Sequence, residues 1–92
     1  MPAPPRRTLL LLVLVYAIES DSAGRVYIGY TGDIESRLKY HNSGFVRSTA
    51  IDKPWRLIAF EEIENKNKAR WLERSLKKSR GMRLKWLVKN QI

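Results

Sequence analysis

The chain of 92 residues contains no cysteine and a single histidine, His41. Without cysteine it cannot form a disulfide framework, a thiolate zinc site or a thiol nucleophile. One histidine also excludes a metal site built from several imidazole rings. Any metal ion would therefore be held by carboxylates, which favours a hard ion such as Mg²⁺.

Acidic residues are almost absent from the last third of the chain. Residues 65–92 carry ten lysines and arginines but only one acid, Glu73, whereas basic and acidic residues balance over residues 1–64. The whole net charge of +9 therefore lies in the C-terminal segment. Such clustering is typical of proteins that bind a polyanion, most often nucleic acid; a solvated basic helix without a partner is the alternative.

The N-terminal part has no apolar run long enough to cross a bilayer. Residues 1–8, with three prolines, are expected to form a disordered lead-in, and residues 9–92 a single domain. The apolar run at residues 9–18 is too short for a membrane span and predicts a buried strand. A secretory signal, with Arg6 and Arg7 before the run, is the alternative. The strand interpretation predicts a cytoplasmic protein without a membrane partner.

The spacing of apolar and turn-forming residues predicts the element order β-β-α-β-α-α. Strands are expected at 9–18, 25–30 and 55–62, and helices at 33–42, 66–79 and 82–89. A short turn makes the first two strands an antiparallel hairpin. A three-stranded sheet would cover its apolar surface with helices, which gives an α/β fold of the α+β type.

Capping residues set the expected helix ends. Asp33 is a candidate N-cap for the first helix, and Gly44 a stop signal. Asn65 or Asn67 can cap the second helix, and Gly81 is expected to break it. Residues 43–54 are expected to form a loop. A core position is favoured for each tryptophan over base stacking or a partner contact, namely for Trp55, Trp71 and Trp86.

Two tyrosines and a glycine lie on the predicted hairpin. Pairing of the strands could bring the phenols of Tyr16 and Tyr27 to one region of the sheet. Gly29 is unfavourable inside a strand, so it indicates either a group that closely approaches the backbone or a simple bend. Tyrosines are also ordinary strand residues, so these positions alone do not identify a site.

A cation, a histidine and an isolated acid add the other groups that phosphodiester hydrolysis requires. Arg37 and His41 are four residues apart and share a helix face. A guanidinium binds phosphate, a carboxylate such as Glu73 can hold a metal ion, and a tyrosine or His41 can act as the general base. The alternative is a solvated helix face, with Glu73 paired to Arg70 or Lys77.

The pattern of these residues resembles that of the GIY-YIG endonucleases. Leu14-Val15-Tyr16 is followed after ten residues by Tyr27-Ile28-Gly29, in the manner of the two motifs that name the family. The resemblance spans about residues 12–88. Further matching positions are Arg37, His41 to Gly44, Lys53 to Trp55, Ala69 and Leu72-Glu73. It implies a three-stranded antiparallel sheet flanked by helices in a small stand-alone protein.

The resemblance also implies roles for individual residues. Tyr16 and Tyr27 match the motif tyrosines, one of which helps to activate water, and the sequence does not assign which. Arg37 matches the arginine that stabilises the phosphate, and His41 a position that assists proton transfer. Glu73 matches the glutamate that binds one divalent ion, Mg²⁺ or Mn²⁺.

The first motif departs from the family pattern, because Leu14 and Val15 stand where glycine and isoleucine are usual. Gly29 matches the glycine of the second motif. The residues expected to contact the nucleic-acid backbone are Gly29, Lys66, Lys68, Arg70, Arg74, Lys77, Lys78 and Arg80.

The expected function is that of a metal-dependent endonuclease that hydrolyses phosphodiester bonds in DNA. We expect it to be directed by structure rather than sequence, since backbone contacts carry no sequence information. The partner would be the backbone of DNA or RNA, and the role DNA repair or recombination. A non-catalytic nucleic-acid-binding module of the same fold is the alternative, and a secreted cationic protein is a third hypothesis.

Overall fold

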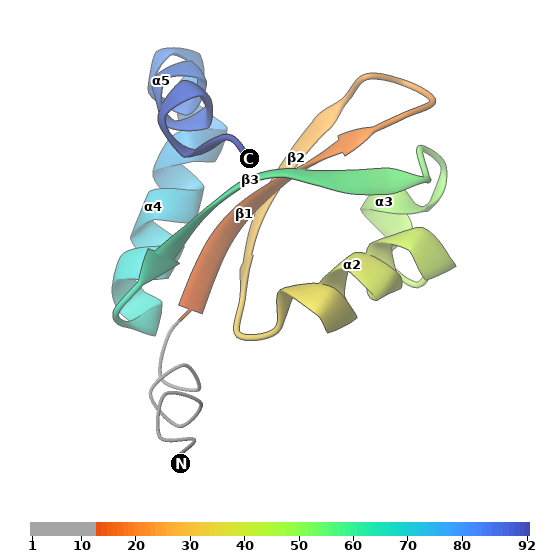
Figure 1. Cartoon of the computed structure of the whole chain (residues 1–92), viewed down its shortest axis with the longest axis horizontal. Helices are drawn as coiled ribbons and strands as arrows, with labels where there is room; N and C mark the ends of the chain where they lie inside the picture. The colour runs from red at the N-terminus through yellow and green to blue at the C-terminus, as the bar shows by residue number, and fades with distance from the viewer. Residues whose placement is uncertain (1–12) are drawn as a thin grey trace.

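The computed structural model describes residues 13–92. The predicted lead-in at 1–8 and the first part of the predicted first strand, 9–12, lie outside the described residues. Three strands form one antiparallel sheet in the order β2-β1-β3 (Figure 1). They are β1 (Val13–Ser20), β2 (Val26–Thr31) and β3 (Trp55–Ile63). The predicted α+β fold with a three-stranded antiparallel sheet is confirmed.

Four helices accompany the sheet over the described residues: α2 (Ile34–Ser43), α3 (Arg47–Ala50), α4 (Lys66–Lys78) and α5 (Arg80–Asn90). The predicted cap at Asp33 and stop at Gly44 are both confirmed for helix α2, which lies one residue later than the predicted range of 33–42. The Asp33 side chain accepts a hydrogen bond from the Ser36 backbone N–H, and Gly44 ends the helix at a φ of 90°, in the left-handed region that favours glycine. Asn65 caps α4 in the same way.

Two helix predictions were wrong. The predicted loop at 43–54 contains the short helix α3. The break between the last two helices falls at Ser79 and not at Gly81, which lies in the first turn of α5. The reason is that the Ser79 side chain accepts a hydrogen bond from the Met82 N–H and so caps α5, whereas an exposed glycine in a first turn is tolerated.

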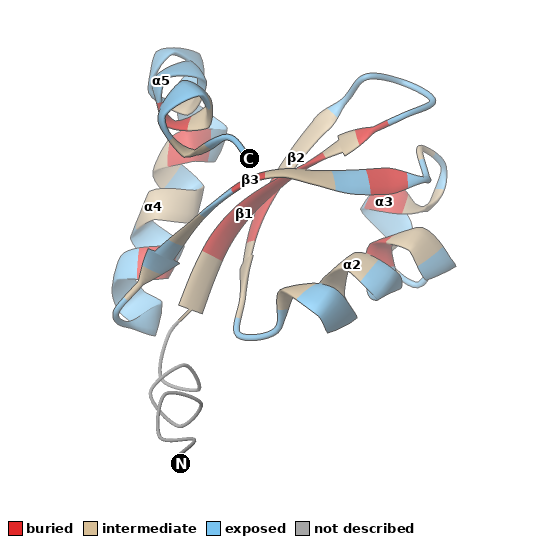
Figure 2. Cartoon of the chain, viewed as in Figure 1, coloured by how far each residue is buried: buried red, intermediate tan, exposed pale blue. Residues whose placement is uncertain are grey.

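Strand β1 is the central strand, and both of its faces are covered (Figures 1 and 2). Val15 and Ala17 face α4 and α5, where they pack with Ala69, Leu76 and Trp86. Tyr16 and Ile18 point to the opposite face and pack with Trp55 and with Ile34 and Leu38 of α2. Covering on both faces explains why the strand is a continuous apolar run instead of an alternating one.

The three tryptophans have different environments. Trp55 and Trp86 are buried, and each indole N–H has an acceptor, the Thr49 carbonyl at 2.8 Å and the Glu61 carboxylate at 2.8 Å. Trp71 is 64% exposed, so its predicted core position was wrong. Ala69, Leu72 and Leu76 form the inward face of α4, and Trp71 lies outside that spacing. No helix among residues 13–92 has both the length and the apolar character to cross a membrane.

Gly29 lies directly opposite Tyr16 in the pairing of β1 and β2. A β-carbon at position 29 would be 2.5 Å from the Tyr16 hydroxyl oxygen and 2.7 Å from Cζ of the same ring. The predicted close approach to the Gly29 backbone is therefore confirmed, and the approaching group is the Tyr16 ring. Glycine at this position gives the ring the space to lie across β2.

We expect Gly29→Ala to lower the free energy of unfolding by about 1–3 kcal/mol, because the added methyl group forces the buried Tyr16 ring aside. Urea unfolding measures the change. Gly81→Ala is the matched control: its β-carbon would meet nothing within 4 Å, and alanine in a helix should add up to about 1 kcal/mol. A Gly29→Ala protein as stable as the wild type would contradict the packing described.

Candidate active site

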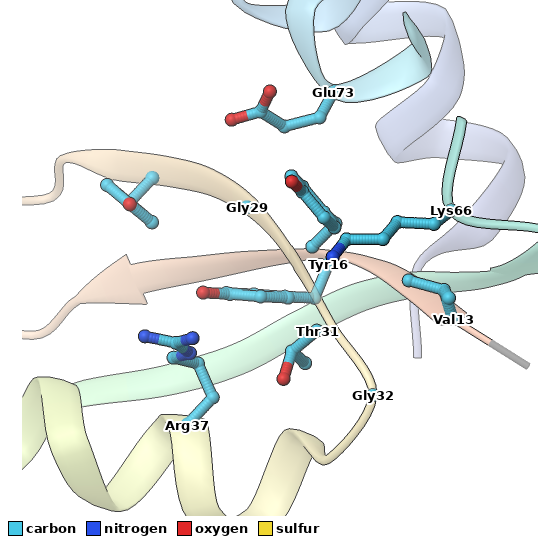
Figure 3. A pocket seen from close by; sticks show the side chains of 10 residues that line it. Val13, Tyr16, Gly29, Thr31, Gly32, Arg37, Lys66 and Glu73 are labelled. Carbon is cyan, nitrogen blue, oxygen red and sulfur yellow. The ribbon is translucent and has the colours of Figure 1, made fainter. Parts of the chain in front are cut away.

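A pocket of about 560 Å³ opens where α2, the edge strand β2 and α4 converge (Figure 3). The predicted site residues that line it are Tyr16, Tyr27, Gly29, Arg37, Lys66 and Glu73. In Figure 3, Arg37 from α2 and Glu73 from α4 approach from opposite sides, and Tyr16 lies between them. The pocket thus brings together a guanidinium, a phenol and a carboxylate from three different elements.

His41 lies behind the pocket and is hydrogen-bonded to Tyr16. The Tyr16 hydroxyl is 2.9 Å from His41 Nε2, and His41 Nδ1 is 2.9 Å from the Thr49 hydroxyl. The Thr49 hydroxyl in turn donates to the Val46 carbonyl at 3.2 Å. Because a hydroxyl has one proton to donate, Thr49 accepts from Nδ1–H, and Nε2 accepts the proton of Tyr16. The network therefore specifies the neutral Nδ1–H form of His41.

Burial keeps both members of the Tyr16–His41 pair neutral. Tyr16 is 2% exposed and His41 is 1% exposed. Desolvation raises the pKa of Tyr16 far above its usual range, with a further rise from Tyr27, while the Arg37 charge lowers it. Desolvation and the Arg37 charge both lower the pKa of His41. At neutral pH the pair is a phenol donating to an imidazole.

Tyr27 has a different environment from Tyr16. Its ring centroid lies 4.9 Å from the His41 ring and 6.5 Å from the Tyr16 ring. The Lys77 ammonium lies 5.2 Å from the Tyr27 ring centroid. Within residues 13–92 no side chain or backbone group is hydrogen-bonded to its hydroxyl, so Tyr16 is the tyrosine with a direct path for its proton.

Among residues 13–92, Glu73 is the only carboxylate that lines the pocket. Its side chain is 14% exposed, and its Oε2 is 2.7 Å from Lys77 Nζ, the i+4 pair that the sequence suggested. No cluster of three or more metal-ligating side chains occurs among residues 13–92. A single carboxylate facing an open pocket suits Mg²⁺, which commonly takes one or two carboxylates and completes its shell with water and substrate phosphate.

Arg37 supplies the positive charge opposite Glu73. It lies one helical turn before His41 on α2, and its guanidinium is 5.7 Å from the Tyr40 ring centroid. Planar guanidinium groups can hold phosphate through two hydrogen bonds. The pocket therefore has one wall that fits a phosphate oxygen and one that fits a metal ion.

The predicted nucleic-acid contacts on α4 and α5 divide into three sets. Lys66 lines the pocket, and Lys77 and Arg80 line a neighbouring groove. The other predicted nucleic-acid contacts are exposed on α4 and line neither space; they are Lys68, Arg70, Arg74 and Lys78. The sequence therefore predicted a basic helix of which only part faces the candidate site.

Thr49 is a site residue that the sequence did not indicate. It is fully buried in α3, within the region expected to be a loop, and it holds Nδ1 of His41. No spacing or motif identifies it, because its contact with His41 depends on how the chain folds back between α2 and β3.

The chain is similar to several known proteins. A family model of the GIY-YIG catalytic domain matches residues 13–85. A UPF0213 protein of Lactococcus lactis subsp. cremoris is 35% identical over 72 residues, which cover 73% of this chain and 70% of the relative. A UPF0213 protein of Clostridium perfringens is 35% identical over 69 residues, covering 73% and 74%. No solved structure matches the chain.

The lowered pKa of His41 predicts a fall in stability at mildly acidic pH. The folded state holds His41 neutral below its ordinary pKa of 6.5, so the unfolded state binds the proton more readily. The free energy of unfolding should therefore decrease as the pH falls from about 7 to about 5. Because this is the single histidine, His41→Gln should remove the decrease over that range.

Urea unfolding of both proteins at the two pH values measures this effect. The pKa of Asp33, lowered by its hydrogen bonds to Ser36, lies below the range and does not interfere. An equal change in stability for the wild type and His41→Gln would show that His41 is not held neutral in the fold.

Proposed function

Because the chain belongs to the GIY-YIG family, which is a family of nucleases, we propose that it is a metal-dependent endonuclease acting on DNA. The observation that supports this most is the convergence of Tyr16, Arg37 and Glu73 in one pocket, with His41 behind Tyr16. The names of the UPF0213 relatives state no activity. We further propose that cleavage is directed by the structure of the DNA rather than by its sequence, and that it serves DNA repair or recombination. RNA is the alternative substrate.

Substrate binding would begin with Arg37 and Lys66. Both line the pocket, and Arg37 can hold a non-bridging oxygen of the scissile phosphate with its guanidinium. The charge of Arg37 is effective there because the buried Tyr16 and His41 behind it are poorly solvated. These contacts reach the backbone and not the base edges, so they favour recognition of shape over sequence.

The attacking water would lose its proton through Tyr16. A free phenolate is unfavourable at this buried position, because desolvation raises the pKa of Tyr16. In a concerted step, the water proton moves to the Tyr16 oxygen while the Tyr16 proton moves to Nε2 of His41. The hydroxide attacks phosphorus, the bond to the leaving oxygen breaks, and His41 ends as an imidazolium whose Nδ1–H still donates to Thr49.

Glu73 would hold Mg²⁺ or Mn²⁺, which supplies Lewis-acid stabilisation of charge on the phosphate and the leaving oxygen. Its orientation toward the pocket and its partial burial support this role. The Lys77 ammonium, 2.7 Å from Glu73 Oε2, balances the charge of this carboxylate.

The Glu73–Lys77 ion pair also favours a second candidate function. A carboxylate that is already paired at 2.7 Å has less need of a metal ion, as would be expected in a nucleic-acid-binding module without turnover. The substitution Glu73→Gln separates the two candidate functions.

The position of the N-terminal apolar run within the sheet supports a protein that acts in the cytoplasm. Residues 13–17 belong to β1, the central strand, which pairs with both β2 and β3. Removal of a secretory signal after Ala17 would delete most of this strand, including Tyr16.

We expect Glu73→Gln to abolish cleavage while DNA binding is kept or strengthened, because the variant loses the metal ligand and one negative charge. Labelled duplex, flap, branched and single-stranded DNA would be incubated with Mg²⁺ or Mn²⁺ or with EDTA. Glu64→Gln, which changes an exposed acid outside the pocket, is the matched control. Metal-independent cutting, or full activity of Glu73→Gln, would contradict the proposed role of Glu73.

Tyr16→Phe and Tyr27→Phe should differ in their effect on cleavage. Removal of a general base costs about 10²- to 10⁴-fold in rate, and we expect this loss for Tyr16→Phe, whose hydroxyl is bonded to His41. Tyr27→Phe keeps the ring that packs on His41 and should lose much less. Single-turnover cleavage rates compare the two, and a larger loss for Tyr27→Phe would reverse the assignment.

A further inference from the structure

A second groove, of about 600 Å³, runs along the β2 edge of the sheet next to the pocket. Tyr27 lines both spaces, so the groove begins where the pocket ends. Its other walls come from β2 and from the junction of α4 and α5. The residues that carry the following argument are Ile28, Lys77, Arg80, Arg83 and Leu84.

The charged residues of the groove are all positive. Lys77, Arg80 and Arg83 line it, and no acidic residue in the described part of the chain does. Arg83 is engaged in the fold, since it donates hydrogen bonds to the Leu76 and Lys77 carbonyls at 2.9 and 3.4 Å. Lys77 is paired with Glu73. Arg80 is exposed and has no ion-pair or hydrogen-bond partner among residues 13–92, so it is the cation available to a ligand.

The rest of the groove is apolar. Ile28 is buried, and Leu84 is 49% exposed beside the three cations. A nucleic-acid backbone alternates charged phosphates with the apolar faces of its sugars, so it matches a groove that has cations on one wall and aliphatic side chains on another. Continuity with the pocket through Tyr27 favours a nucleic-acid strand over an acidic protein segment.

We propose that this groove is a second phosphate-binding subsite, which holds the backbone of the cleaved strand next to the scissile phosphate, with Arg80 as its main ligand. The inference rests on the proposed function, because it takes the neighbouring pocket as the reaction centre. It extends that function by giving the strand a defined path, from the pocket past Tyr27 toward the α4–α5 junction.

The test compares Arg80→Gln with Lys85→Gln, which removes the same charge from an exposed position of α5 outside the groove. The dissociation constant of a fluorescein-labelled DNA duplex would be measured without metal at several salt concentrations. Loss of one phosphate contact should reduce the slope of log Kd against log salt by about 0.9 in Arg80→Gln. Lys85→Gln should keep the wild-type slope, and circular dichroism checks that both variants fold.

Equal slopes for the two variants would overturn the proposal. It would also be overturned if Arg80→Gln lost binding to a poly-glutamate probe while its DNA affinity stayed at the wild-type level. A smaller slope for Arg80→Gln supports the subsite even where the wild type cuts no substrate, and in that case only the proposed nuclease activity fails.

A cleavage arm tests the position of the subsite on the strand. Substrates would be shortened one nucleotide at a time on each side of the cut. The wild type should lose kcat/KM sharply on one side, at the length that removes the phosphate held by Arg80. Arg80→Gln lacks the contact with this phosphate, so its kcat/KM should not change when the phosphate is removed. An equal loss of kcat/KM in both proteins would contradict the assigned contact.

Discussion

The hydrogen bond from Tyr16 to His41 connects the centre of the sheet to α2, and the candidate site depends on it. It can form only because Gly29, opposite Tyr16 in β2, leaves space for the tyrosine ring. His41 is held from its other side by Thr49. The neighbouring Asn42 binds the backbone N–H and carbonyl of Trp55, at 2.6 and 3.0 Å, so the helix that carries His41 is fixed to the start of β3.

The same arrangement separates neutral from charged groups. Tyr16 and His41 are buried and uncharged, whereas Arg37 and Glu73 face the pocket from opposite walls. In the proposed mechanism, a buried relay next to two partly buried charges would let a proton move at neutral pH without a free phenolate, while the charges would act on the phosphate. The excess positive charge of the C-terminal segment then lies beside this centre, in α4 and α5, and not across the whole surface.

Much of the fold could be predicted from local signals. The strands, the α2 cap at Asp33 and the stop at Gly44 follow from short-range patterns and are present. The start of α5 could not be predicted correctly, because a serine cap at Ser79 competed with the more familiar glycine signal at Gly81. Trp71 shows that a large aromatic residue on a helix can be exposed when the inward spacing is already filled.

Most residues of the candidate site could be predicted from the sequence, but their contacts could not. Tyr16, Tyr27, Arg37 and Glu73 could be selected from residue chemistry and the family resemblance, and they line one pocket. The choice between the two tyrosines required the three-dimensional structure, since only the fold shows which hydroxyl is hydrogen-bonded to His41. Thr49 and the groove at Arg80 depend on contacts between elements far apart in the sequence, and no linear pattern records them.

The proposed relay requires that His41 accepts the Tyr16 proton on Nε2 and donates its own from Nδ1. A long-range ¹⁵N–¹H correlation spectrum of the single histidine at neutral pH tests it most directly, because no other imidazole contributes signals. We expect a neutral ring protonated on Nδ1, with Nε2 free to accept. A ring protonated on Nε2, or an imidazolium, would mean that Tyr16 has no acceptor there, and would contradict the proposed relay.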